Sequence, residues 1–427
     1  TLAVPIPGIP LLLEIEPLGY LFALVASSLW IVTSLYAIGY MRGHHEEHQT
    51  RFYFFFAVAI AATMGVAFSG NLFTLFLFYE VLTLCTFPLV THHQTKEARK
   101  AGRVYLGILL STSVGLQLLA IIWTYSLAGT LDFRAGGILD GHIGAGTVPI
   151  LLALFVFGVG KAAVMPFHRW LPAAMVAPTP VSALLHAVAV VKAGVFTILK
   201  VSVFIFGPAL ISETGAADIL LWVAAATIIL GSLVAFTKDN LKARLAYSTI
   251  SQLSYIVLGA LLANEWGIIG GGMHIVMHAF GKITLFFGAG AIMVAAHKTD
   301  ISQMKGLGRT MPFTFGAFFI GSLSIIGLPP AGGSWSKWFL GMGTLEAGQL
   351  GLLAVLMVSS LLSLVYLLEV PVKAFFCKPT KPLEHEGIHE APLPSLLAMG
   401  VTSLATIGLF IYPEPFFQLM QLVVGNQ

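Results

Sequence analysis

Five lysines lie inside otherwise apolar stretches of this chain: Lys161, Lys192, Lys200, Lys282 and Lys337. A charged side chain near the middle of a lipid bilayer costs at least ~3 kcal/mol, so such residues usually face a water-filled path or a polar partner. The chain has only 22 Lys and Arg residues, and five is a large share of them to place in so unfavourable a setting. Because an ammonium group can release and rebind a proton, these lysines indicate proton movement through a membrane.

Glu80 is the only carboxylate deep inside an apolar stretch. It could form a structural ion pair that tethers two helices. It could instead pair with Lys161, so that moving the carboxylate away lets the lysine lose its proton. The two roles are compatible, and the second one would make the pair a switch.

His274, His278 and Lys282 follow one another at intervals of four residues, which places them on one face of a helix. Two histidines at this spacing could bind a metal, but no carboxylate or cysteine joins them on that stretch. They could also be packing histidines, and we favour a proton relay over both alternatives. His186 and Lys192 repeat the combination at an offset of six residues, so their shared face is less certain.

Two further features favour simpler explanations. Lys200 has no proline, histidine or acid close by in the sequence, so snorkelling or helix packing explains it as well as transport does. The run from His44 to His48 could hold a metal, but we expect a solvated turn there. No nucleotide-binding, haem-binding or hydrolytic motif is present. We therefore expect no cofactor, no metal, and no redox or hydrolytic site of the chain's own, which leaves its status as an enzyme open.

The composition fixes the class of protein. Hydrophobic residues make up 57% of the chain, charged residues 10%, and the mean hydropathy is +0.90. These values predict an all-α polytopic membrane protein rather than a nucleic-acid-binding or soluble one. The apolar stretches run unbroken instead of alternating, which excludes a transmembrane barrel.

Hydropathy predicts about twelve membrane spans. They cover residues 18–40, 52–69, 71–92, 104–127, 148–165, 181–206, 218–237, 245–263, 268–296, 312–330, 350–375 and 395–412.

The loops between these spans differ sharply in charge. Sixteen Lys and Arg residues fall in the loops of one face, namely 41–51, 93–103, 166–180, 238–244, 297–311 and 373–392. The opposite loops and both ends hold only Arg134. By the positive-inside rule the basic loops are cytoplasmic and both termini lie outside, in the plasma membrane of a prokaryote. The start at Thr1, without an initiator methionine, is consistent with a missing upstream piece.

Two spans are predicted to be broken. Pro166 follows Lys161 closely, and the run Pro329 to Gly333 precedes Lys337. Proline and glycine interrupt helices, and the freed backbone groups in a membrane must line a cavity or be buried in protein. We expect four regions: 1–51 with the first helix, a five-helix unit 52–206, a second five-helix unit 218–375, and a C-terminal helix and tail 395–427. Because the first unit holds an odd number of spans, the second unit enters the membrane from the opposite side and forms an inverted repeat of the first. We also expect a continuous hydrophilic line that joins the two breaks near the membrane midplane.

Four stretches, taken together, are similar to one known family. They are Gly160 to Pro172, Ala177 to His186, Leu245 to Gln252, and the His274-x-x-x-His278-x-x-x-Lys282 stripe. On these motifs the chain resembles the antiporter-like subunits of respiratory complex I and of Mrp-type multisubunit cation/proton antiporters, from about residue 18 to 413.

The resemblance implies proton translocation along a central polar axis. It assigns Glu80 and Lys161 to a carboxylate–lysine pair, His278 and Lys282 to a bridging position, and Lys337 to the site by the second break. It also implies other integral membrane subunits and lipid as partners, with protons as substrate and sodium as an open second one. Family members usually have about fourteen core spans and some carry a long lateral helix. No long lateral helix is expected after residue 413, which points away from the largest subunit type and towards the D-type Mrp subunit or its complex I equivalents.

We therefore predict a proton-translocating, antiporter-like membrane subunit of a multisubunit complex, either an Mrp-type antiporter or a complex I-like dehydrogenase or hydrogenase. Protonation would pass from Lys161 through His186 and Lys192, then His274, His278 and Lys282, to Lys337. The alternatives are a stand-alone sodium/proton antiporter and a structural subunit that does not conduct. Trp338 follows Lys337 where relatives often carry an acid, so the sequence supports the last step less than the first.

Overall fold

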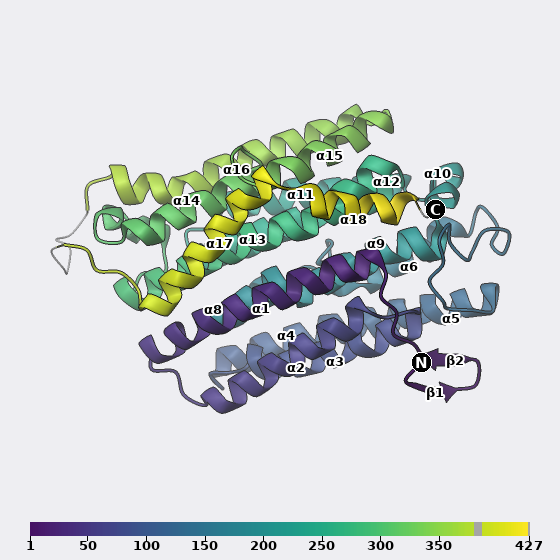
Figure 1. The fold of residues 1–427 in the computed structure, drawn as a ribbon, viewed down its shortest axis with the longest axis horizontal. Coiled ribbons are helices and arrows are strands. Elements are labelled where there is room, and N and C mark those ends of the chain that lie inside the picture. Colours follow the sequence, from purple (N-terminus) through teal and green to yellow (C-terminus); the bar gives the residue numbers. More distant parts are fainter. Residues whose placement is uncertain (380–386, 426–427) are drawn as a thin grey trace.

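The structure, a computed structural model, describes residues 1–379 and 387–425, and it describes Leu185 and His186 by their backbone only. The chain begins with an antiparallel hairpin of β1 (Ala3–Ile6) and β2 (Ile9–Leu11), in which Ala3 lies opposite Leu11. Helices that run mostly along one direction make up the rest, and they form an elongated bundle (Figure 1).

Nine helices in the described part of the chain are long and apolar enough to cross a membrane. They are α1 (Pro17–Gly43), α2 (Gln49–Ala67), α3 (Leu72–Val90), α4 (Lys96–Thr112) continuing through the π-helical η1 (Ser113–Gln117) into α5 (Leu118–Ala128), α11 (Asp218–Thr237), α12 (Leu241–Leu262), α13 (Glu265–Ala296), α16 (Leu350–Phe376) and α17 (Leu393–Ile411).

A tenth candidate span is bent. It follows α8 (Thr179–Ala183) and η4 (Leu184–Val188), and consists of α9 (Val190–Val201) and η5 (Ser202–Phe206), joined at an angle of 83° to α10 (Pro208–Thr214). Two apolar helices are shorter, α6 (Val148–Gly158) and α14 (Pro312–Ile326). The remaining elements are η2 (Gly160–Ala162), α7 (Trp170–Ala173), η3 (Ala174–Val176), η6 (Ile301–Gln303), η7 (Leu307–Arg309), α15 (Gly333–Glu346) and α18 (Glu414–Gly425).

Each span predicted from hydropathy overlaps one of these helices or a run of adjoining helical segments, so the all-α, polytopic fold is confirmed. The helix in the predicted span 148–165 ends earlier than predicted, at Gly158. The two short helices, α6 and α14, are those that the sequence predicts to be broken, and each is followed by a further helical piece, α7 and α15. The full count of twelve spans and the inverted relation between 52–206 and 218–375 stay predictions. The hairpin and α18 were not predicted.

Polar side chains mark the starts of several helices. Glu16 accepts hydrogen bonds from the backbone N–H groups of Leu18 and Gly19 at the start of α1. The side chains that cap α3, α4, α12 and α13 in the same way are Asn71, Thr95, Asn240 and Asn264. Such caps satisfy backbone donors that have no partner within the helix.

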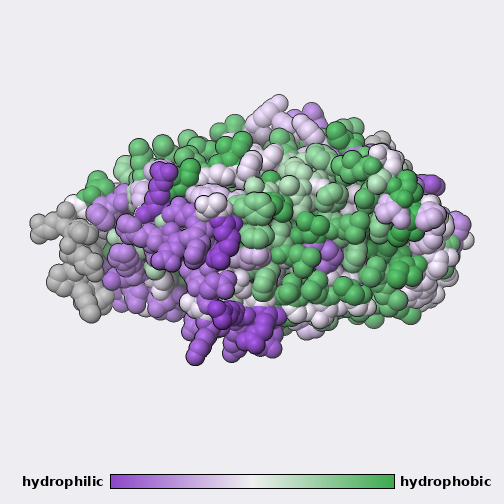
Figure 2. Space-filling model, turned by 90° about the horizontal axis from the view of Figure 1, so that it is seen from below, coloured by the Kyte–Doolittle hydropathy of each residue, from purple (hydrophilic) through white to green (hydrophobic). Residues whose placement is uncertain are grey.

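The basic loops meet at one end of the molecule. Arg51 donates to the carbonyl of His92 (2.9 Å), Lys242 donates to that of Ala177 (2.6 Å), and the N–H of Gly306 donates to that of Lys373 (3.2 Å). The N- and C-termini lie at the opposite end (Figure 1). Figure 2 shows hydrophilic side chains gathered towards the end with the basic loops, with hydrophobic side chains over much of the remaining surface. We call this end the basic-loop face.

Helices α12 and α13 form the centre of the bundle. In α12, 94% of the most apolar 18-residue window is buried, and in α13 72%, against 33% in α16. A polar side chain on α12 or α13 therefore faces protein rather than lipid.

Candidate proton-conducting line

The break after α6 positions Lys161. The helix ends at Gly158, and Lys161 lies in the short η2 turn that follows. Two glycines allow the break to pack closely: a Cβ on Gly158 would lie 2.4 Å from the backbone nitrogen of Gln117, and one on Gly160 would lie 2.2 Å from the hydroxyl of Thr112. The broken segment thus lies directly against α4 and η1.

Neutral groups of α3 hold the Lys161 ammonium. The Nζ atom donates to the carbonyl of Tyr79 (2.8 Å) and to the hydroxyl of Thr83, and it lies 3.1 Å from the centre of the Tyr79 ring. The side chain is fully buried. Carbonyl, hydroxyl and aromatic ring are all partners that favour an ammonium.

Glu80 follows Tyr79 on the same helix, but it does not bond to Lys161 here. Among the described residues, neither oxygen of the Glu80 carboxylate has a hydrogen-bond partner. Burying a carboxylate without a partner is costly. Glu80 and Lys161 therefore lie on neighbouring elements in a separated arrangement, and the switch that pairs them stays a prediction.

The centre of the line begins at Lys192. The Nζ atom of Lys192 on α9 lies 2.8 Å from Nδ1 of His278 on α13. The ring of His278 contacts that of His274 one turn away, with 5.7 Å between ring centres. His274 in turn contacts the hydroxyl of Ser336 on α15 through Nδ1 (2.8 Å) and Gln252 on α12 through Nε2 (3.1 Å).

Lys337 completes the line at the second break. The ring of His274 stacks on Tyr255, with 5.6 Å between centres, and the Lys337 ammonium lies 4.7 Å from the centre of that tyrosine ring. Lys337 also donates to the hydroxyl of Ser360 (2.9 Å) and to the carbonyl of Ile326, the last residue of α14 (3.1 Å). One hydrogen bond, two ring contacts and a cation–π contact therefore connect Lys192 with Lys337; we call the side chains of this series the central line.

Lys282 lies two turns beyond His274 on the same face of α13. Its Nζ atom donates to the hydroxyl of Ser248 (2.8 Å) and approaches the carbonyl of Leu245 (3.4 Å), both on α12. The hydroxyl of Tyr366 donates to the same Ser248 (3.0 Å) and lies 2.9 Å from the hydroxyl of Ser363. This branch therefore connects α13 to α16 through hydroxyl groups that can pass a proton along.

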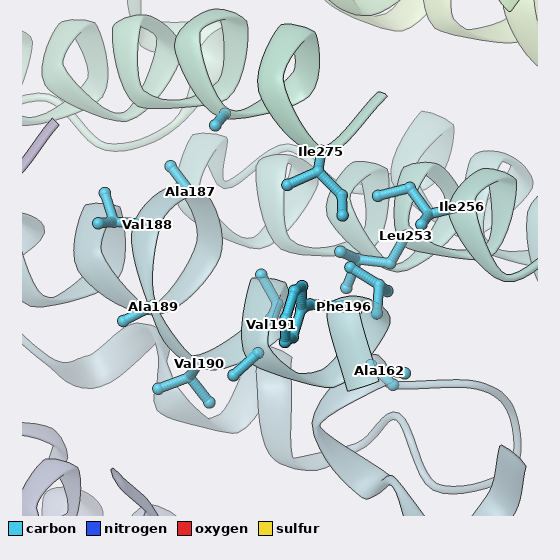
Figure 3. Packing of buried hydrophobic residues seen from close by; sticks show 14 of the residues in the cluster. Ala162, Ala187, Val188, Ala189, Val190, Val191, Phe196, Leu253, Ile256 and Ile275 are labelled. Carbon is cyan, nitrogen blue, oxygen red and sulfur yellow. The ribbon is translucent and has the colours of Figure 1, made fainter. Parts of the chain in front are cut away.

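Lys161 and the central line are not connected by hydrogen bonds among the described residues, and both have buried apolar neighbours. Within the described part of the chain, no hydrogen bond joins Lys161 to Lys192 or His278. Figure 3 shows part of this buried apolar cluster, including Ala162 and Val191, the chain neighbours of Lys161 and Lys192, together with Phe196 and Leu253. The contacts of the central line reach from Lys192 to Lys337 and do not include Lys161, so the continuous hydrophilic line between the two breaks stays a prediction.

His186 and Lys200 are not among the residues of the central line as defined above. The side chain of His186 lies outside the described residues, so its place in the relay stays a prediction. Lys200 is fully buried and forms an ion pair with Glu16 (3.0 Å), and it also donates to the carbonyl of Ser69 (2.8 Å). It thereby ties α9 to the start of α1, outside the central line, which supports the packing explanation.

The expectation of a solvated turn from His44 to His48 is wrong for Glu46. The Glu46 side chain is only 6% exposed and its carboxylate lies 3.2 Å from Nδ1 of His44 and 3.1 Å from Nε2 of His93. Burial raises the pKa of Glu46, but the hydrogen bond from His93 and the charges of the nearby histidines outweigh it and hold the pKa below its usual value. His93, from the next basic loop, could not be assigned to this turn from its spacing.

Sequence reasoning missed the polar groups that connect the lysines and histidines. Ser248, Gln252 and Tyr255 follow at intervals of four and three residues on α12, a spacing that places them on one helix face. That pattern could have predicted the polar face of α12. Ser336 and Ser360 had no such pattern, because each comes from a different helix.

The similarity to known proteins decides the family. Residues 69–363 match the family described as "NADH:quinone oxidoreductase/Mrp antiporter, TM". NADH-quinone oxidoreductase subunit N of Desulforudis audaxviator (strain MP104C) is 36% identical over 390 residues, which cover 90% of this chain and 75% of that protein. The chain belongs to this antiporter-like family.

Other members of the family are named for different complexes. Hydrogenase-4 component B of Escherichia coli (strain K12) is 31% identical over 422 residues, covering 93% of this chain and 62% of its own length. A protein of Rhizobium meliloti (strain 1021) that is named as part of a probable K(+)/H(+) antiporter is 32% identical over 429 residues, covering 96% and 42%. The chain thus spans about half the length of several curated relatives.

Two solved structures share the fold. A chain of the membrane-bound sulfane sulfur reductase, an archaeal respiratory membrane complex, matches with a TM-score of 0.85 and 25% identity, over 97% of this chain and 83% of that one. A chain of the Mrp complex from Dietzia sp. DQ12-45-1b matches with a TM-score of 0.84 and 24% identity, over 96% and 84%. The present chain is therefore a multi-pass membrane protein similar to subunits of multisubunit membrane complexes.

Proposed function

We propose that the chain moves protons through the membrane as an antiporter-like subunit of a larger complex. The observation that carries this proposal is the central line, in which buried amine, imidazole and phenol groups contact one another in series from Lys192 through His278, His274 and Tyr255 to Lys337. A scaffold gains nothing from such a line, because each buried charge costs free energy that apolar packing would not.

The proposed path begins at Lys161, crosses to Lys192, and ends at Lys337, with Glu80 controlling the first site. The amine and imidazole groups along it can accept a proton from one neighbour and pass it to the next. The chain contributes the path, and the energy comes from a partner subunit or from an opposing ion gradient. We further propose a D-type Mrp-like role in a prokaryotic plasma membrane, with the basic-loop face cytoplasmic.

Vesicles that contain the chain with its partner subunits can test the path. Lys192→Met and Lys337→Met remove one carrier each, and we expect each to slow proton movement at least tenfold, measured with a fluorescent pH probe. The matched control is Lys200→Met with Glu16→Gln, which removes another buried lysine together with its ion-pair partner. If Lys192→Met and Lys337→Met transport like the control, the chain is a structural subunit.

A further inference from the structure

An apolar groove runs along the outer surface of the bundle, where α14 and α16 lie side by side (Figure 1). It has a volume of about 250 Å³, and only apolar side chains line it. Its walls include Gly316 and Phe319 of α14 and Leu368, Val372 and Phe376 of α16. The groove is open to the surroundings, because Phe319, Val372 and Phe376 are 42%, 48% and 83% exposed.

Two residues of the wall account for the groove. Gly316 brings no side chain to it, and a Cβ placed on Gly316 would meet nothing within 4 Å. Pro371 lies inside α16, where a proline lacks the N–H donor and usually bends the helix. The two helices therefore leave space between them at this level.

The groove ends at the basic-loop face, and two exposed cations lie there. Gly308 of η7 packs on the wall, because a Cβ on it would lie 2.6 Å from the ring of Phe375. Arg309, the next residue, is exposed. Lys378 is also exposed and lies two residues beyond Phe376 in the chain. The apolar groove thus has a positively charged end.

Two acids at this end already have partners. The Glu369 carboxylate forms an ion pair with Lys373 (2.6 Å). The Glu390 carboxylate accepts hydrogen bonds from backbone N–H groups at the start of α14 (2.7 and 3.2 Å). Within the described ranges, no ion pair engages Arg309 or Lys378. These two side chains can therefore bind an anion from outside the chain.

The shape of the groove fits a hydrocarbon chain better than a helix. From Leu368 to Phe375 the wall of α16 spans seven residues, or about 10 Å. Over that length, the whole open space of about 540 Å³ gives a cross-section of about 55 Å². A helix that is about 10 Å across occupies about 80 Å². The groove also fits within one leaflet, whose hydrocarbon half is about 15 Å thick.

We propose that the groove binds an acyl chain of an anionic phospholipid, whose phosphate contacts Arg309 and Lys378. The apolar walls remove the acyl chain from other surroundings, and both basic side chains donate hydrogen bonds to phosphate oxygens. Basic residues beside grooves between membrane helices favour anionic head groups in this way. Neither Arg309 nor Lys378 belongs to the central line, so the proposal does not depend on proton movement.

A photoactivatable lipid tests the site in the whole complex. Vesicles of phosphatidylcholine receive a small fraction of either phosphatidylglycerol or phosphatidylcholine with a diazirine in one acyl chain. After illumination, mass spectrometry of peptides measures the lipid attached to the stretch from Leu368 to Phe376. We expect at least fivefold more attachment of phosphatidylglycerol than of phosphatidylcholine. A fivefold preference corresponds to about 1 kcal/mol, the usual contribution of one basic residue at an anionic membrane surface.

Removal of the two cations tests the head-group contact. In Arg309→Gln with Lys378→Gln, we expect attachment of phosphatidylglycerol to fall to the level of phosphatidylcholine. The matched control is Lys96→Gln with Lys100→Gln, which removes two exposed cations from the start of α4. The control should keep the preference of the parent chain.

Filling the groove tests the acyl-chain contact. Gly316→Leu adds a side chain to the wall without a clash at Cβ, and leucine favours a helix more than glycine does. We expect attachment of phosphatidylglycerol to α16 to fall at least fivefold. Gly400→Leu on α17, where a Cβ also meets nothing within 4 Å, is the control and should bind like the parent. Gly316→Met, with a more adaptable side chain, replaces Gly316→Leu if the latter does not assemble.

Several results overturn the proposal. Equal attachment of the two lipids, or an unchanged preference in Arg309→Gln with Lys378→Gln, rules out the head-group contact. Absence of attachment in the parent shows that a partner subunit covers the groove. Attachment at the parent level in Gly316→Leu shows that the lipid lies elsewhere on α16. Lys192→Met, which tests the proposed function, should bind phosphatidylglycerol like the parent, so the two proposals fail separately.

Discussion

The Lys161 ammonium has partners that do not change charge. The Tyr79 carbonyl, the Thr83 hydroxyl and the face of the Tyr79 ring all surround it, whereas the Glu80 carboxylate bonds to none of the described residues. Lysine and glutamate therefore act on each other through space in this arrangement. The strength of such an action grows as the separation falls and as water is excluded, so a small movement of α3 changes how firmly Lys161 holds its proton.

Replacement of Lys161 separates a proton carrier from a fixed charge. We expect Lys161→Ala and Lys161→Arg both to reduce proton movement at least tenfold, because a guanidinium group keeps its proton at neutral pH. The measurement is proton movement in vesicles that hold equal amounts of assembled complex. A fully active Lys161→Arg variant would show that the site needs only a positive charge.

Replacing Glu80 with glutamine should reduce proton movement without changing how the chain folds and assembles. We expect Glu80→Gln to leave insertion, assembly and thermal stability in detergent close to those of the parent, because the carboxylate has no hydrogen bond to lose among the described residues. Proton movement should fall strongly, because Lys161 loses the charge that controls it. Loss of assembly with normal transport in the assembled fraction would instead identify Glu80 as a tether.

At the scale of elements, Gly194 allows η2, the turn at the first helix break, to pack closely against α9. A Cβ on Gly194 would lie 2.4 Å from the backbone of both Lys161 and Ala162. The turn that carries Lys161 therefore rests on α9 two residues from Lys192. This contact brings the backbone of Lys161 close to the part of α9 that carries Lys192, although the two lysine side chains have different partners.

Gly194→Ala tests this contact. The added methyl group must push η2 away from α9, and overpacking of this kind typically costs about 1–3 kcal/mol. We expect a lower midpoint of thermal unfolding in detergent together with slower proton movement. Gly107→Ala on α4, where a Cβ meets nothing within 4 Å, is the control and should be neutral or slightly stabilising. Equal effects of the two changes would contradict the proposed role of the contact.

Hydropathy and proline spacing predicted most helices and both breaks, because membrane spans and broken helices have strong local signals. The one-face stripe from His274 to Lys282 was predictable for the same reason. Partners from distant parts of the chain were not. Lys200 meets Glu16, Lys337 meets Ser360, and Glu46 meets His93, and each contact depends on how helices pack rather than on any spacing within one helix.

At the scale of the whole molecule, the described contacts divide the proposed path in two. One part holds Glu80 and Lys161 against α3, and the other is the central line from Lys192 to Lys337. Because no hydrogen bond among the described residues joins Lys161 to Lys192, a proton passes between them only if the side chains move or water enters.

The same arrangement argues against sodium exchange by the chain alone. Sodium is a hard cation that needs several oxygen ligands. The charged groups along the proposed path are mostly ammonium and imidazole groups, which repel a cation when protonated, and Glu80 is the one carboxylate that we place on this path. We therefore expect proteoliposomes that contain only the purified chain to keep an imposed pH gradient when sodium is added, as followed by a fluorescent pH probe. A protonophore, added last, checks that the gradient was present.

Rapid loss of the gradient on addition of sodium, but not of choline, would show that the chain is a sodium/proton antiporter in its own right. Exchange that requires the partner subunits would instead place the missing oxygen ligands on them.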